Sequence, residues 1–326
     1  MSILVLGGAG YIGSCAALGL RRRGYDVIVA DNMEKGHKSA VPQGVPLFVG
    51  DVRDFDFMSA LFEENKIDAV MDFAAYSLVG ESVAQPAQYY DNNVYGMLCL
   101  LRAMMLSGVD KIVFSSSAAV YGEPEDALVA EDAPKLPKSP YGETKLVIEN
   151  MLKYFGAAYG IRSACLRYFN AAGAMGGLGE DHKPETHLIP IVLRAAMTES
   201  AVTLNGDDYD TPDGTCVRDY VHVEDLAEGH ILALERLKEA PGAHVWNVGS
   251  GRGASILEIL EAARRVTGAR IKTKTGPRRP GDPSRLVADV SKIRGELGFA
   301  AKRADIEDII ESAWRFLRDK PNGYCG

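Results

Sequence analysis

The sequence lacks the cysteine patterns that stabilise small secreted domains or bind zinc. Its 326 residues include five cysteines, an odd number, and no two of them form a C-x-x-C pair. Disulfide frameworks use paired cysteines and zinc sites use closely spaced ligands, so neither is expected, and a reducing compartment is indicated. We expect most of the cysteines to fill the core; they are Cys15, Cys99, Cys165, Cys216 and Cys325.

Two further absences exclude classes of partner. Lys and Arg number 36 against 44 Asp and Glu, a net charge of −8, whereas a nucleic-acid surface needs a basic face. No apolar run approaches the roughly 18 residues of a membrane span. The N-terminus begins with a core strand and lacks the basic region and cleavage site of a signal peptide. We predict a cytoplasmic protein without nucleic-acid or membrane partners. Its length is sufficient for one large domain or two smaller ones.

The first thirteen residues predict a strand, a glycine-rich turn and a helix. Ser2–Leu6 is an apolar run typical of a fully buried strand, and Ala16–Leu20 has apolar residues at helical spacing. Between them, Gly7 permits a tight turn, Gly10 lets backbone amides approach a pyrophosphate, and Gly13 lets the helix pack on the strand. This spacing is a weak signal when it occurs alone.

The next strand strengthens the interpretation. Residues 26–30 form a second apolar strand that ends at Asp31, eighteen residues after Gly13, where a carboxylate would bind the adenosine ribose. The alternative is a solvated strand end. Because no arginine directly follows Asp31 to receive a 2′-phosphate, NAD is favoured over NADP.

Strands and helices continue to alternate, which predicts a parallel sheet covered on both faces. The fold class is therefore α/β, a Rossmann doubly wound parallel sheet (residues 1–168) with a smaller C-terminal α/β substrate domain (169–326), some segments of which return to the sheet. The predicted strands are 46–50, 68–75, 111–115, 163–168, 245–248 and 271–275, with a strand and helix at 217–238. The predicted helices are 55–65, 87–107, 140–158, 189–197, 255–266 and 305–318.

Two motifs indicate proton chemistry. Ser115–Ser117 follow a buried strand; the alternative is a serine-rich turn that caps a helix. Tyr141 and Lys145 lie four residues apart on a helix that begins at Ser139 and Pro140, so they share one face. For a tyrosine to act as a base near neutral pH, its pKa must fall by about three units, roughly 4 kcal/mol. A cation about 4 Å away in a partly buried site supplies about that much. The alternative is an exposed Tyr–Lys pair.

These motifs together resemble the extended short-chain dehydrogenase/reductase family. Residues 168–173, 215–225 and 278–282 narrow the resemblance to sugar-nucleotide enzymes, and along essentially the whole chain it is strongest to the UDP-sugar 4-epimerases. It implies an NAD-dependent isomerase that interconverts UDP-galactose and UDP-glucose through a transient 4-keto intermediate. Another UDP-sugar (N-acetylglucosamine, pentose or uronate) is the alternative substrate. A dehydratase is disfavoured because Ala118 and Ala119 stand where that enzyme has Asp and Glu. Retention of Ser117 and of the Tyr–Lys pair disfavours a nonenzymatic NAD-binding regulator.

The resemblance also implies the site residues and the partners. The catalytic residues are Ser117, Tyr141 and Lys145, and no metal is implied. NAD is bound by Gly7, Gly10, Tyr11, Ile12, Gly13, Asp31, Asn32, Asp51, Val52, Phe73, Ala74, Ala75, Ser77, Asn92, Ser115, Tyr141, Lys145 and Tyr168. The UDP-sugar is bound by Ser117, Tyr141, Asn170, Leu188, Asn205, Arg218, Arg279 and Asp282. From the residues alone, the two arginines are equally consistent with surface ion pairs. A homodimer through the helical patterns 87–107 and 140–158 is implied as well.

Three positions depart from the best-known members of that family. Ser77 stands in place of a lysine near the nicotinamide, Ala119 in place of a threonine, and Leu286 in place of the tyrosine or cysteine that closes the sugar pocket. Leucine is smaller than tyrosine, which leaves room for an N-acetylated sugar. The sequence therefore leaves open the preferred sugar, the pathway and the retention of NAD.

Overall fold

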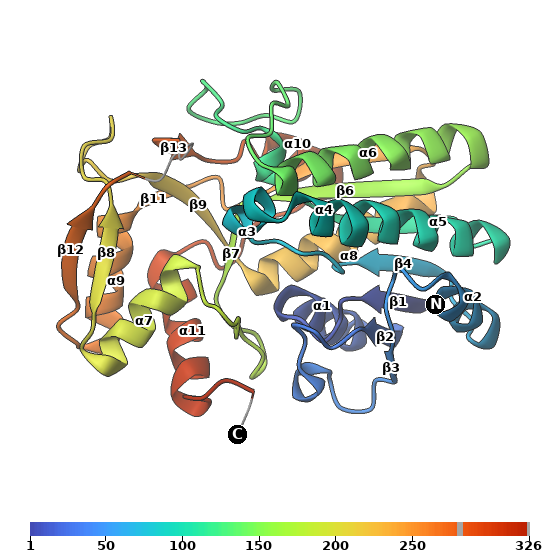
Figure 1. Ribbon diagram of the computed structural model, residues 1–326, viewed down its shortest axis with the longest axis horizontal. Coiled ribbons are helices and arrows are strands. Elements are labelled where there is room, and N and C mark those ends of the chain that lie inside the picture. The colour runs from blue at the N-terminus through green and yellow to red at the C-terminus, as the bar shows by residue number, and fades with distance from the viewer. Residues whose placement is uncertain (279–282, 325–326) are drawn as a thin grey trace.

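A sheet of seven parallel strands forms the centre of the computed structural model, which describes residues 1–278 and 283–324 (Figure 1). The strand order reverses at β1, with β2 and β3 on one side and β4 and β5 on the other. In doubly wound sheets a ligand binds at such a reversal, outside the carboxyl ends of the strands. The predicted parallel sheet is confirmed. Its strands, in spatial order, are β10 (Ala243–Val248), β6 (Arg162–Tyr168), β5 (Lys111–Ser117), β4 (Ala69–Asp72), β1 (Ser2–Leu6), β2 (Asp26–Asp31) and β3 (Leu47–Val49).

Helices cover both faces of this sheet. One layer contains α1 (Tyr11–Arg22) and α8 (Val223–Glu239), and the other contains α2 (Phe55–Glu64), α5 (Gly96–Leu106) and α6 (Pro140–Tyr159). Successive residues of β1 point to opposite layers: Ile3 and Val5 belong to the α1–α8 core, and Leu4 and Leu6 to the other. Burial on both faces explains the continuous apolar runs in these strands.

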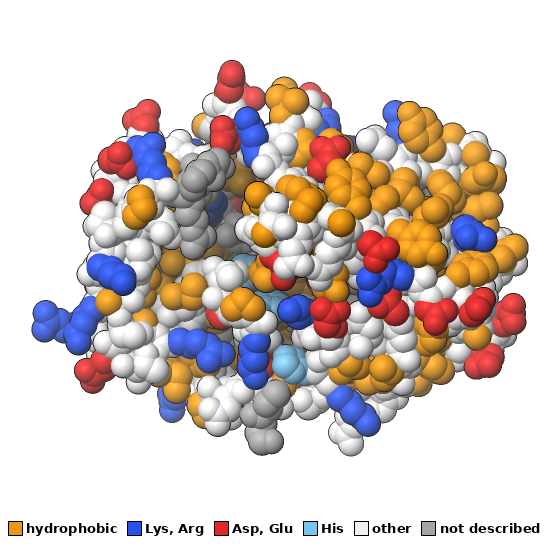
Figure 2. Space-filling model, viewed as in Figure 1, with side chains coloured by type: hydrophobic (Ala, Val, Ile, Leu, Met, Phe, Trp, Pro, Cys, Tyr) orange, Lys and Arg blue, Asp and Glu red, His pale blue; other side chains and the backbone are white. Residues whose placement is uncertain are grey.

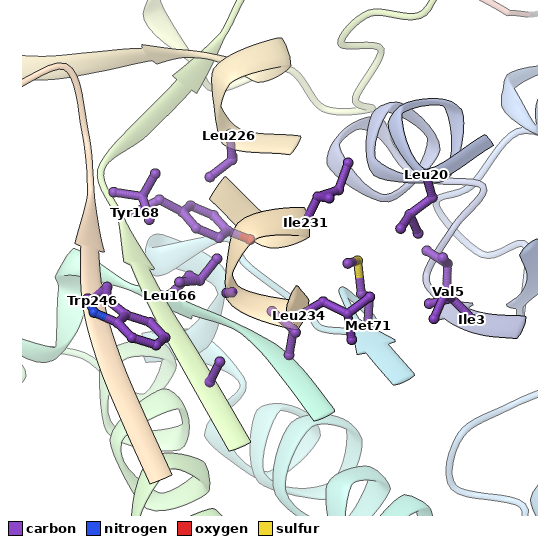
Figure 3. Close-up of a cluster of buried hydrophobic side chains, with 14 of the residues drawn as sticks. Ile3, Val5, Leu20, Met71, Leu166, Tyr168, Leu226, Ile231, Leu234 and Trp246 are labelled. Carbon is purple, nitrogen blue, oxygen red and sulfur yellow. The ribbon is translucent and has the colours of Figure 1, made fainter. Parts of the chain in front are cut away.

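Helix α8 is the central element of the first layer, although it lies far along the chain from the strands it covers. Its side chains Leu226, Ile231 and Leu234 project into the core between α1 and the strands (Figure 3). Trp246 of β10 closes the same core and is fully buried, and its indole nitrogen donates a hydrogen bond to Glu296 Oε2 at 2.8 Å.

A second group of elements lies beside the sheet, on the left in Figure 1. Strands β8 (Ala201–Asn205) and β12 (Lys272–Gly276) pair in parallel, and β9 (Val217–His222) pairs with β7 (Asn170–Ala172), β11 (Gly253–Ser255) and β13 (Arg285–Leu286). Three helices pack with these strands around a separate core: α7 (Leu188–Thr198), α9 (Ile256–Thr267) and α11 (Ile306–Asp319). The short α10 (Ser291–Leu297) follows β13. Strand β10 lies between β9 and β11 in the chain, but it joins the large sheet beside β6.

The helix predicted over residues 87–107 is not continuous. It consists of α4 (Pro86–Tyr89), a π-helical turn (Tyr90–Tyr95) and α5, and the unpredicted α3 (Val79–Ala84) precedes it. The π-helical turn contains two buried asparagines. The Asn93 amide donates to Tyr76 O and Thr144 Oγ1, both at 3.1 Å. These partners are distant in sequence, so helical periodicity did not predict the wider turn.

Strand β5 was predicted to end at Ser115, which is wrong. It continues through Ser117, and Ser115–Ser117 pair in register with Leu166–Tyr168 of β6. The buried Ser116 hydroxyl donates to Glu149 Oε1 at 2.5 Å. A buried hydroxyl with a partner is compatible with a central strand, and only the fold brings that partner close.

The predicted role of the cysteines is confirmed for the four that the structure describes, because Cys15, Cys99, Cys165 and Cys216 are buried. Cys325 lies outside the described residues. Short 3₁₀ turns occupy Lys38–Ala40 and Ala118–Val120. Among the described helices, none is long and apolar enough to cross a membrane.

The packing of α8 on the sheet predicts the effect of Leu234→Ala. Leu234 is fully buried, so the cavity should lower the free energy of unfolding by about 2–5 kcal/mol in urea titrations. The control is Leu136→Ala, at a site with 65% exposure, which should change stability by less than about 0.5 kcal/mol. Equal effects of the two substitutions would contradict this packing.

Candidate active site

A cleft of about 500 Å³ opens at the carboxyl edge of the sheet, where the strand order reverses. It gathers residues that are widely separated in sequence. Those that were predicted from sequence and line it are Gly7, Gly10, Tyr11, Ile12, Gly13, Asp31, Asn32, Val52, Phe73, Ala74, Ala75, Ser77, Asn92, Ser115, Ser117, Tyr141, Lys145, Tyr168 and Asn170.

The glycine-rich turn at one end of the cleft has the backbone that its sequence predicted. Gly7 has a φ of +69°, and a Cβ there would lie 2.7 Å from the carbonyl carbon of Phe73. A Cβ on Gly13 would lie 2.2 Å from Gly7 O. At Gly10 the nearest such atom is 3.3 Å away, and this residue lines the cleft. No described side chain caps α1 there, so its first N–H groups are available to an anion.

Asp31 ends β2 inside the cleft. Its Oδ2 accepts from the Ala9 N–H at 3.0 Å and its Oδ1 from the Met33 N–H at 2.9 Å, which fixes the carboxylate beside the glycine turn. Burial raises its pKa, and these two hydrogen bonds oppose the rise. A carboxylate oxygen accepts more than one hydrogen bond, so Asp31 can also receive ribose hydroxyls. The turn, the helix terminus and this carboxylate fit a dinucleotide.

Asp51 does not line the cleft as the described residues define it, although its neighbour Val52 does. The Asp51 carboxylate instead accepts from Arg53 Nε at 2.9 Å and Nη2 at 2.7 Å. These bonds lower the pKa of Asp51 to about 2. Arg53 also donates to Asp91 Oδ2 at 2.7 Å, so this guanidinium joins the segments after β3 and α4.

Tyr141 and Lys145 enter the cleft from the first turns of α6. The helix begins as its sequence predicted: Ser139 Oγ accepts from the Gly142 N–H at 3.2 Å, and Pro140 occupies the first turn. Tyr141 is 9% exposed. Burial raises its pKa, and a side-chain hydrogen bond with Ser117 lowers it by less. In the protein alone, the pKa of Tyr141 is therefore raised, whereas a base near neutral pH requires a lowered one.

Lys145 is almost completely buried, with 2% exposure. Its ammonium donates to Ser115 O at 2.6 Å and lies 5.8 Å from the centre of the Tyr141 ring. Burial lowers the pKa of Lys145 to about 8, while the carboxylates of Asp72 and Glu149 oppose the fall.

Asp72 is a buried carboxylate that acts on Lys145 and that sequence reasoning missed. It ends β4 opposite Phe114 of β5, is 5% exposed, and accepts from the Ala74 N–H at 3.0 Å. Burial raises its pKa to about 6, and Lys145 opposes the rise. The available signal was an acidic residue within an apolar strand.

Several cleft residues on irregular segments were also missed. Tyr76 donates to Glu34 Oε2 at 2.6 Å, and a segment from Glu180 to His187 runs along the cleft. Strand and helix periodicity gives no signal for such segments, but the alternation of Glu and His between residues 180 and 187 was visible.

The predicted UDP-sugar residues divide into three groups. Asn170 lines the cleft, whereas Leu188, Asn205 and Arg218 lie outside the lining drawn from the described residues. Arg279 and Asp282 lie outside the described residues.

Arg218 contacts the backbone at Pro283. It is 9% exposed and donates to Pro283 O at 2.7 Å, and Leu286 pairs with it across β9 and β13. The neighbouring Asp219 is fully buried and accepts from the N–H groups of Ser250 at 2.8 Å and Gly251 at 3.0 Å. Both side chains are therefore buried, whereas the alternative interpretation expected them on the surface.

Comparisons with known proteins agree with this geometry. The family described as "NAD dependent epimerase/dehydratase family" matches residues 3–249. A UDP-glucose 4-epimerase from Lacticaseibacillus casei is 50% identical over 327 residues, covering 99% of each chain. A solved UDP-glucose 4-epimerase aligns with a TM-score of 0.97 at 48% identity, over 100% of both chains. A UDP-glucose 4-epimerase from Bifidobacterium longum, solved with NAD+ and UDP, gives a TM-score of 0.93 at 42% identity, covering 99% of this chain and 100% of that one.

The buried ammonium predicts that Lys145→Met stabilises the ligand-free protein. A lowered lysine pKa means that the charged form opposes folding, by up to about 3 kcal/mol below pH 8. Between about pH 8 and 10.5 only the unfolded chain keeps the proton, so the wild-type stability rises with pH. Urea titrations should therefore show a gain at pH 7 that shrinks by pH 9.5. A pH-independent loss of stability would contradict the assignment.

Proposed function

Since the chain belongs to the NAD dependent epimerase/dehydratase family, we propose that it interconverts UDP-galactose and UDP-glucose at its cleft, with Ser117, Tyr141 and Lys145 as catalytic residues. The convergence of these three side chains on a dinucleotide cleft is the observation that carries the proposal. The family resemblance predicted from the motifs is confirmed.

The chemistry requires a reversible oxidation at a sugar carbon. Bound NAD would supply the hydride acceptor and donor for the oxidation and the reduction from the opposite face. Gly7, Gly10, Gly13 and Asp31 would hold this cofactor. Tyr141 takes the proton of the sugar 4-hydroxyl and later returns it, and the Ser117 hydroxyl bridges the two groups.

Positive charge makes this proton transfer possible. Burial raises the pKa of Tyr141 in the protein alone, so the phenolate needs stabilisation beyond the hydrogen bond with Ser117. Lys145 contributes one buried cation, and a positively charged cofactor would contribute another, in a site where low polarity strengthens both. The reaction therefore uses a base that becomes effective when the cleft is filled.

We expect the enzyme to bind the substrate mainly through its UDP group, which does not react. An anchored UDP group lets the sugar turn within the cleft, which an inversion at one carbon requires. We assign this anchoring to residues 169–326, where Asn170 lines the cleft and Arg218 is buried nearby, with residues 1–168 holding NAD. Arginine matches phosphate oxygens through paired N–H groups.

The test is incubation of purified protein with UDP-galactose, followed by anomeric-proton NMR for UDP-glucose. We expect an equilibrium mixture, and Tyr141→Phe should lower the rate at least about 10²-fold because the phenol oxygen is absent. The matched control Tyr25→Phe alters a tyrosine that directly precedes β2, at the edge of the sheet opposite the cleft, and should keep the wild-type rate. No product with or without added NAD would overturn the UDP-galactose assignment.

A second substrate class is favoured by one observation. Leu286 packs against the buried cluster formed by the turn after Ser117, which contains Ala118 and Val120. The family resemblance places this residue at the edge of the sugar pocket, where leucine is smaller than tyrosine, so we propose that an N-acetyl group fits. The same NMR assay with UDP-N-acetylgalactosamine measures that activity.

We further propose that the enzyme acts in the cytoplasm as a homodimer. Apolar side chains gather over α5 and α6, where Figure 2 shows a broad hydrophobic surface. Exposed residues there include Leu106 at 77%, Tyr154 at 70% and Tyr159 at 58%. A contiguous apolar patch on a soluble protein is typical of a protein interface, and a twofold axis would pair this patch with itself.

The dimer is tested by light scattering. Leu106→Lys combined with Tyr154→Glu places charges within the apolar surface, so the mass should fall from two chains to one. Leu136→Lys, at an exposed loop position, should leave the mass at two chains. A single-chain mass for the wild type would exclude the homodimer.

A further inference from the structure

Four potential metal ligands converge beside the cleft. Glu180, His182, Glu185 and His187 lie on the segment between β7 and α7, and one donor atom from each lies within 4.8 Å of the others. In the described part of the chain, this is the one place where three or more such side chains converge. The reaction proposed above uses none of them.

The separations between the donor atoms suit a small tetrahedral ion. His182 Nδ1 lies 3.0 Å and His187 Nδ1 lies 2.6 Å from Glu180 Oε1, and His187 Nδ1 lies 3.1 Å from Glu185 Oε1. Zinc bonds to imidazole nitrogen and carboxylate oxygen are about 2.1 Å long, so tetrahedral ligand atoms stand about 3.4 Å apart. Small side-chain rotations would convert the present contacts into that arrangement.

An unpartnered oxygen independently indicates a ligand. Glu185 Oε2 is buried and has no hydrogen-bond partner among the described residues, and the Glu185 side chain is only 9% exposed. The side chain of Glu180 is 7% exposed. The Oε1 atoms of both carboxylates already contact His187 Nδ1, but a buried acceptor without a donor, such as Glu185 Oε2, is costly. A divalent cation would satisfy this acceptor.

The surrounding structure holds the ligand segment in place. The Asp181 carboxylate accepts from the Tyr324 N–H at 2.9 Å, and the Tyr324 hydroxyl accepts from the Gly179 N–H at 2.9 Å. The imidazoles of His182 and His187 are 30% and 45% exposed, which leaves an entry path for an ion from solvent. A fixed backbone and an open entry are both required of a metal site.

We propose that Glu180, His182, Glu185 and His187 bind one divalent transition metal ion, with Zn²⁺ the best match to two imidazoles and two carboxylates. Four protein ligands leave no open position, which is typical of structural sites. The ion would fasten the Glu180–His187 segment over the glycine-rich turn, where the His182 ring lies 6.5 Å from that of Tyr11. The ion would therefore keep the edge of the cleft ordered and would take no part in the proton transfer.

The test uses the full chain after treatment with EDTA, titrated with Zn²⁺ by calorimetry and with Co²⁺ by absorption. We expect one ion per chain, a visible Co²⁺ spectrum of tetrahedral intensity without thiolate charge-transfer bands, and a Zn²⁺-dependent rise in melting temperature. The absence of thiolate bands excludes binding at the cysteines.

Matched variants locate the ion. Glu185→Gln preserves the shape of the side chain and should weaken Zn²⁺ binding at least about tenfold, and His182→Ala with His187→Ala should abolish it. His244→Gln, which alters a histidine on β10 stacked against Trp246, should bind as the wild type does. Circular dichroism checks that each variant is folded. If the wild type binds no ion, or if Glu185→Gln binds as tightly as the wild type, the cluster is a hydrogen-bonded His–Glu network and the proposal is wrong.

Discussion

The arrangement of the active site depends on how the structure accommodates the buried charge of Lys145. An ammonium at 2% exposure loses most of its hydration, and it donates a hydrogen bond to Ser115 O. The remaining stabilisation comes from carboxylates on different elements, Asp72 at the end of β4 and Glu149 on α6. These groups meet only because β4 pairs with β5 and α6 packs on the sheet. The charge of the site therefore depends on the fold.

Tyr141 is buried as well, but burial raises its pKa, whereas it lowers the pKa of Lys145. A buried lysine is more easily deprotonated, whereas a buried tyrosine is harder to ionise, and the structure shows both directions in neighbouring side chains. An empty cleft therefore disfavours the Lys⁺ and phenolate pair that proton transfer needs. A cation entering the cleft would restore the phenolate, which links the activation of the base to the binding of the cofactor.

Local signals explain which features could be predicted from the sequence. Gly13 is required by the close approach of Gly7 O within one turn, Gly7 has a positive φ, and Ser139 caps a helix through a hydrogen bond from the N–H three residues later. Features that depend on distant partners could not be predicted in this way. The continuation of β5 through Ser117 needs β6 and Glu149, and the π-helical turn needs partners of Asn93 elsewhere in the chain.

The residues of the candidate site also differ in whether a local signal in the sequence could predict them. The Tyr141 and Lys145 pair was visible as a spacing of four residues, but the direction of the pKa of Tyr141 depends on burial, which spacing does not report. Asp72 was hidden within an apolar strand, and the Glu180–His187 segment has no regular periodicity. Sequence therefore indicated the chemistry of the site, and the structure supplied its electrostatics.

The role of positive charge in the cleft is tested most directly by measuring the ionisation of Tyr141. Tyrosinate absorbance, measured against pH as the difference between the wild type and Tyr141→Phe, should be recorded for protein with and without bound NAD. We predict that the pKa of Tyr141 is high in the NAD-free protein and falls when NAD binds, and that it falls less in Lys145→Met. An unchanged Tyr141 pKa on NAD binding would contradict the claim that charge in the filled cleft creates the base.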